Sequence, residues 1–182
     1  MHFSKITMNS RSKTEAFSDI VDERDRETLE LFGPSFQFLL APQPSDEAPC
    51  VIKGTIPPGV SVLIHQHRSV EACFVISGNV EVLSESGGVT HWIPAGPGDF
   101  IEIPSNAKHA FRNKSEHPVV VLMTINSKLG RFFQEIGRPI TPGARLNPPS
   151  PDELQRLVKT CERYGYWLAK PEENASAGVA SF

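Results

Sequence analysis

The stretch from residue 34 to residue 127 consists of many short runs of β-branched, aromatic and other apolar residues. Turn-forming segments rich in glycine, proline and asparagine separate these runs, for example at 57–59, 78–79 and 94–98. Such runs bounded by such turns predict β-strands. The expected strands are 36–40, 51–56, 61–65, 71–76, 80–83, 89–93, 100–103, 109–112 and 119–125. Many short strands with closely spaced turns predict an all-β domain, either a sandwich or a closed barrel.

Two histidines stand two residues apart at the end of one expected strand. Because successive side chains of a strand alternate between its faces, His65 and His67 are expected to point the same way. Residues 68–70 would form a short loop that turns the chain back and brings the carboxylate of Glu71 toward the imidazoles. This mixture of nitrogen and oxygen ligands suits Fe(II), Mn, Co, Ni, Cu or Zn rather than Ca or Mg. The pattern predicts a transition-metal site, whereas a lone strand histidine is usually an ordinary polar residue.

A second ordered motif lies further along the chain, and its marker residues are Gly98, Pro104, His109 and Asn113. Together with residues 59–78 it resembles the two signature motifs of the cupin superfamily. The resemblance implies an all-β fold, the double-stranded β-helix or jelly-roll barrel, with short C-terminal helices. It also implies that one divalent metal is bound by His65, His67, Glu71 and His109.

The order of segments narrows this resemblance. One motif pair is present, so we expect a single-domain cupin. Residues 132–139, followed by a proline-rich linker and a helix, resemble small quercetin-dioxygenase-like cupins. The chain departs from the family at two places. Three residues separate His67 from Glu71 where quercetinases often have four, and Asn106 stands where the family usually has glycine. Asparagine tolerates a positive φ better than other non-glycine residues, so the turn at Asn106 is expected to persist.

A metal with three imidazole ligands and one carboxylate, in a six-coordinate shell, leaves up to two positions for substrate and dioxygen. We therefore expect a metal-dependent dioxygenase, an oxidoreductase acting on an enolisable or ring-containing small molecule. Glu71 would be a movable ligand or the general base. The same site could serve an isomerase, cyclase or decarboxylase, or a barrel that binds a small molecule without turnover. Oxygen consumption separates the first alternative from the second, and turnover separates both from the third.

Two other residues are weaker candidates for the substrate pocket. Phe111 has the same strand parity as His109, and Cys73 has the same parity as Glu71, so both side chains could face the cavity. The simpler interpretations are ordinary barrel core for Phe111 and a buried, inert thiol for Cys73.

The segments outside the expected barrel carry fewer signals. Residues 1–33 are polar and charged and are predicted to form a helix-and-loop arm. Residues 128–170 are predicted to form a helical extension that packs on the barrel. It contains a short helix at 131–136 and a second helix that starts with a capping box at 150–153. Gly165 is the expected stop of that second helix. Residues 171–182 are small and polar and are expected to be a flexible tail.

Composition limits the partners and the setting. The net charge of −3 gives no electrostatic reason to expect nucleic acid or an anionic membrane surface. We also expect no signal peptide and no membrane span. Three cysteines without a Cys-x-x-Cys pair favour a reduced, cytoplasmic setting. The cupin resemblance further implies a homodimer.

Overall fold

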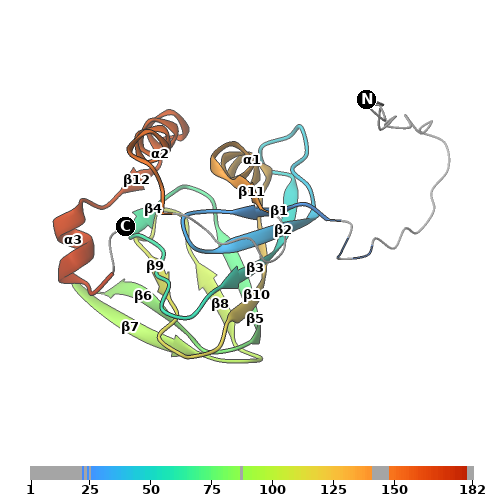
Figure 1. Cartoon of the computed structure of the whole chain (residues 1–182). Helices are drawn as coiled ribbons and strands as arrows, with labels where there is room; N and C mark the ends of the chain where they lie inside the picture. Colours follow the sequence, from blue (N-terminus) through green and yellow to red (C-terminus); the bar gives the residue numbers. More distant parts are fainter. Residues whose placement is uncertain (1–21, 23, 25, 87, 141–147, 180–182) are drawn as a thin grey trace, which may run out of the picture.

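Two antiparallel sheets face each other and enclose the core of the protein (Figure 1). The computed structural model describes residues 22, 24, 26–86, 88–140 and 148–179. The larger sheet has the order β11 (Arg138–Ile140), β1 (Thr28–Glu30), β2 (Ser35–Leu40), β3 (Pro49–Ile56), β10 (Val119–Asn126), β5 (Glu71–Ser77) and β8 (Phe100–Ile103). The second wall contains β7 (Val89–Ala95), β6 (Val80–Ser86) and β9 (Ala110–Arg112), and β4 (His65–Gln66) pairs with β12 (Trp167–Leu168). This is the predicted jelly-roll barrel.

The strands form where the sequence alternates between apolar and polar residues. In β3 every second residue is buried, as expected for a strand that covers the core with one face. Side chains from both walls meet inside the barrel, among them Val75, Val82, Phe111 and Val121. Apart from the segment at 61–65, each expected strand coincides with an observed strand to within a few residues.

The predicted strand at 61–65 was wrong in its extent. The structure has single bridges between Ser61 and Arg112 and between His65 and His109. The chain advances four residues from Ser61 to His65, but only three from His109 to Arg112 on the opposite side. The first segment therefore carries one extra residue, which is a β-bulge. The extra residue interrupts the ladder, and regular strand resumes at His65. The bulge re-aims the chain just before the two histidines.

The helical extension forms as expected, with one earlier start. α1 spans Ser127–Ile136, and α2 spans Pro151–Tyr164. α1 begins before the predicted 131 because Asn126, the last residue of β10, caps it by accepting a hydrogen bond from the Leu129 N–H at 3.0 Å. The predicted capping box of α2 is present, and Gly165 ends the helix with φ of 72°. The two helices lie side by side over one end of the barrel (Figure 1).

The helix-and-loop prediction for residues 1–33 needs a correction in the part that is described. Residues 1–21, 23 and 25 lie outside the described residues, but Thr28–Glu30 forms β1 and pairs with β2 and β11. Leu29 and Phe32 are buried. The strand was missed because three residues are too short a run to show period-two alternation.

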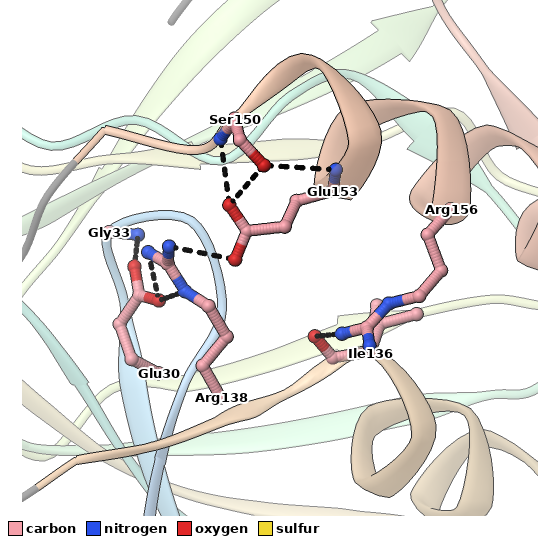
Figure 2. Close-up of polar contacts among 7 residues, drawn as sticks. All are labelled: Glu30, Gly33, Ile136, Arg138, Ser150, Glu153 and Arg156. Atoms are coloured by element: carbon pink, nitrogen blue, oxygen red, sulfur yellow. Dashed lines mark hydrogen bonds and ion pairs between the residues drawn. The ribbon is translucent and has the colours of Figure 1, made fainter.

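A partly buried charge network links this strand to the helical extension. Figure 2 shows Arg138 between two carboxylates from different elements. Arg138 Nε donates to Glu30 Oε2 at 2.8 Å, and Nη1 donates to Glu153 Oε1 at 3.1 Å. The other oxygen of Glu30 accepts from the Gly33 N–H at 2.6 Å. Because the Glu30 side chain is almost fully buried, this pairing satisfies a carboxylate that would otherwise be costly to bury.

The prediction of a flexible tail was wrong for residues 171–179, and residues 180–182 lie outside the described residues. Pro171–Ser176 forms α3, with Asn174 and Val179 buried. Asn174 Oδ1 accepts from the Ile64 N–H at 2.9 Å, and its Nδ2 donates to Ala169 O at 3.1 Å. The sequence did not indicate this helix because its residues are small and polar. It is held to the barrel by the hydrogen bonds of Asn174 rather than by an apolar stripe. Within the described residues, no helix is long and apolar enough to cross a membrane.

Candidate metal centre

The four predicted ligands meet inside the barrel. One candidate ligand atom from each of His65, His67, Glu71 and His109 can be chosen so that all lie within 4.8 Å of one another. His67 Nε2 is 2.9 Å from Glu71 Oε1, and His109 Nε2 is 3.8 Å from the same oxygen. The bridge between His65 and His109 brings the second motif beside the first. The loop at 68–70 turns the chain as expected, so that β5 starts with Glu71 facing the imidazoles.

Local backbone contacts orient all three imidazoles in the same way. The Nδ1 atoms of His65, His67 and His109 lie 2.8, 2.9 and 2.9 Å from the carbonyl oxygens of Leu63, Ser69 and Ala107, respectively. A carbonyl oxygen can only accept, so each Nδ1 carries the hydrogen and donates it. The lone pair of each neutral ring is therefore on Nε2. Such outer contacts fix the tautomer and the ring orientation of a metal-binding histidine.

Burial and mutual contact set the charges of the site. Burial and, after it, the nearby His109 lower the pKa of His65 to about 3. Burial alone would raise the pKa of Glu71, but contacts with His109 and His67 hold it well below its ordinary value. Burial likewise works against the charged form of His109, but Glu71 outweighs it and raises the pKa of His109. Glu71 is accordingly ionised, and His65 is neutral and able to bind a cation.

Two buried atoms of the cluster lack a hydrogen-bond partner. Glu71 Oε2 and His109 Nε2 have none, and Glu71 and His109 are only 2% and 1% exposed. Unpaired buried polar atoms are rare because they are costly, and a bound ion is one of their ordinary explanations. A divalent transition metal fits this donor set, since it would take both atoms as ligands.

The cluster opens into an apolar cavity of about 150 Å³. His65, His67 and Glu71 line one part of it. Phe111 and Cys73 line it too, so the structure places both weaker candidates beside the ligands. Cys73 is fully buried, and burial raises the pKa of its thiol well above the ordinary value, which keeps it protonated. Their roles toward a substrate stay predictions.

One residue at the site was missed by sequence reasoning. Tyr166, just beyond α2, lines the cavity, and its ring centroid is 5.5 Å from that of His67. Its hydroxyl is buried without a hydrogen-bond partner, and burial raises its pKa to about 12. Nothing in the local sequence marks it, because only the antiparallel pairing of β12 with β4 brings it to His67.

Comparison with known proteins agrees with this geometry. Residues 53–125 match the family model described as a cupin domain. The chain carries a cupin domain. It contains β3 to β10 and all four candidate ligands, whereas α1, α2 and Tyr166 lie beyond the matched residues. No curated protein matches the sequence.

Solved structures share the cupin fold at low sequence identity. Oxalate decarboxylase from Lactobacillus farciminis, in a formate complex, matches with a TM-score of 0.50 and 16% identity over 62% of this chain and 34% of that one. A variant of the Bacillus subtilis enzyme matches with a TM-score of 0.50 and 19% identity over 62% of this chain and 30% of that one. An uncharacterized Klebsiella pneumoniae protein with a double-stranded β-helix domain matches with a TM-score of 0.48 and 18% identity, over 61% and 91% of the two chains. This cupin thus matches about a third of the decarboxylases' length, and the likeness shows the fold alone.

Proposed function

We propose that this cupin binds one divalent transition metal through His65, His67, Glu71 and His109, and that it is a dioxygenase for an enolisable small molecule. The observation that carries the proposal is the pair of buried, unpartnered ligand atoms, Glu71 Oε2 and His109 Nε2, in a cluster that opens into an apolar cavity. When bound, the metal would supply a Lewis acid that favours the deprotonated substrate.

The chain's own residues prepare the reaction. The three backbone carbonyls fix the imidazoles before any ligand arrives, so little reorganisation is needed. Glu71 is ionised, and as the movable ligand it can turn its Oε2 from the metal to accept the proton of an enol bound beside it. The apolar lining keeps water from the enolate and strengthens its electrostatic contacts.

The proposed reaction balances with dioxygen as the oxidant. The enol proton moves to Glu71 Oε2 and returns on a product. The carbon–carbon double bond of the enolate breaks, both atoms of dioxygen enter the products, and the four electrons that reduce dioxygen come from the substrate carbons. An isomerase or decarboxylase would use the same proton acceptor without dioxygen.

The first experiment is the metal content of purified protein, compared with a His65→Ala/His67→Ala double variant. We expect about one equivalent of Fe, Mn, Co, Ni, Cu or Zn in the wild type and a loss of it in the variant. A Glu71→Gln variant should retain most of the metal, because the three histidines remain. It should not consume oxygen when given an enol that the wild type turns over. Absence of metal, even after reconstitution, would contradict the proposal. Turnover of enols without oxygen uptake would favour the isomerase or decarboxylase alternative.

A further inference from the structure

The helical extension forms much of the wall of the metal-site cavity. Leu129 and Phe132 of α1, Leu157 and Cys161 of α2, and Tyr166 line it together with the barrel. All five lie outside the matched cupin domain of residues 53–125. The size and polarity of the cavity are therefore set in part by residues beyond the matched cupin domain.

The volume limits the body of a ligand. A dry cavity of about 150 Å³ lined by aliphatic and aromatic side chains accommodates a molecule such as benzene. Pockets for drug-sized ligands are larger, roughly 300–1,000 Å³. This cavity, at about 150 Å³, has room for one ring or a short chain beside the metal ligands, and not for the three rings of a flavonol.

The lining also limits the charge of a ligand. Among the described residues that line the cavity, none is Lys or Arg. Before any proton moves to Glu71, a divalent ion held by neutral imidazoles and one carboxylate has a net charge of +1, which a ligand that enters as a monoanion neutralises. A second negative charge, on a dicarboxylate or a phosphate, would be buried without a partner, at high energetic cost.

Tyr166 offers this cavity a hydrogen-bonding group. The residue is 8% exposed, and its hydroxyl is one of the buried side-chain atoms that lack a partner in the described structure. It lines the same cavity as His67 and Glu71. A phenol hydroxyl can donate to an anionic oxygen bound in the cavity.

We propose that the substrate is a compact, singly charged enol whose apolar body is no larger than one ring, and that Tyr166 donates a hydrogen bond to its oxygen. This inference rests on the proposed metal site. It excludes flavonols, as well as dianions such as oxalate and sugar phosphates, as substrates of this cavity.

The test compares ligands that share one metal-binding group. Maltol and 3-hydroxyflavone both present a 3-hydroxy-4-pyranone, but the second carries two more rings. Binding to zinc-loaded protein is measured by titration calorimetry, with oxalate as the dianion and with zinc content measured before and after. We expect maltol to bind at least tenfold more tightly than 3-hydroxyflavone or oxalate. Equal or tighter binding of 3-hydroxyflavone or oxalate would overturn the proposal. A protein that holds no zinc would instead show the failure of the metal site.

Two tyrosine variants test the role of the Tyr166 hydroxyl. Tyr166→Phe keeps the ring, and maltol affinity should fall roughly three- to tenfold, the size expected for one hydrogen bond. Tyr164→Phe is the matched control, because the Tyr164 hydroxyl contacts Glu135 at 3.3 Å, away from the cavity lining. The affinity of Tyr164→Phe for maltol should equal that of the wild type. Unchanged maltol affinity in Tyr166→Phe would refute the role of Tyr166.

Discussion

Asn106 adopts a left-handed backbone conformation, with φ of 62°, in the turn that leads to His109. Its N–H donates to the carbonyl of His67 at 2.8 Å, so the turn joins the two motifs that supply the metal ligands. Asparagine visits this conformation more readily than other residues with a Cβ atom, and glycine does so without steric cost. The substitution of glycine by asparagine in the second motif is thus compatible with the turn, as the sequence predicted.

This geometry gives a prediction from one pair of variants. Asn106→Gly should leave the free energy of unfolding within about 0.5 kcal/mol of the wild type, because glycine adopts a positive φ without strain. Asn106→Ala should lower it by about 1 kcal/mol, because alanine has a Cβ atom but lacks the polar side chain that stabilises asparagine in the left-handed conformation. Urea unfolding of the three proteins measures both values. Equal stabilities of the alanine and glycine variants would show that backbone strain does not govern this turn.

At the scale of elements, the start of α2 shows how a local motif becomes a tertiary contact. Glu153 accepts from the N–H of Ser150 at 2.7 Å within the capping box, and it also binds Arg138 of β11 (Figure 2). The hydrogen bonds from the backbone and side chain of Ser150, assisted by Arg138, lower the pKa of Glu153 to about 2. The folded protein therefore binds this proton less readily than the unfolded chain does.

The pH dependence follows from that sign. The stabilisation by Glu153 is complete above the ordinary glutamate pKa of 4.5 and is lost as the pH falls toward about 2. Glu153→Gln keeps an acceptor for the capping box but has no charge. Between about pH 5 and pH 3, urea unfolding should show a larger loss of stability in the wild type than in this variant. Other carboxylates titrate in both proteins, so equal losses would mean that Glu153 contributes nothing to the acid sensitivity.

The elements that could be predicted from the sequence are those with a local signal. The capping box at Ser150, the stop at Gly165 and the alternating strands each occupy a few consecutive residues, and all but the strand at 61–65 were confirmed. The four candidate ligands could be identified because two ordered motifs carry them; the structure brings them together, and metal binding stays a prediction. α3 and Tyr166 could not be predicted, because each depends on a partner far along the chain, and β1 is too short to show period-two alternation. The expected homodimer and cytoplasmic location stay predictions.

At the scale of the whole molecule, the C-terminal segment and the first metal-binding motif support each other. β12 pairs with β4, so that Leu168 lies opposite His65. α3 then follows, and Asn174 accepts the N–H of Ile64 across 110 residues of sequence. Ile64 belongs to a small apolar cluster with Leu83, Ala110 and Val179. The segment beyond Pro171 thus holds the backbone directly before His65.

Asn174→Ala tests this coupling. It would leave the Ile64 N–H buried without a partner, so the free energy of unfolding should fall by about 1–3 kcal/mol. Glu172→Ala, an exposed position on the same helix, is the matched control and should stay within about 0.5 kcal/mol of the wild type. Because Ile64 adjoins a metal ligand, Asn174→Ala should also bind zinc more weakly, and the control should not. Equal stability and zinc affinity in the two variants would show that α3 covers the barrel without supporting its site.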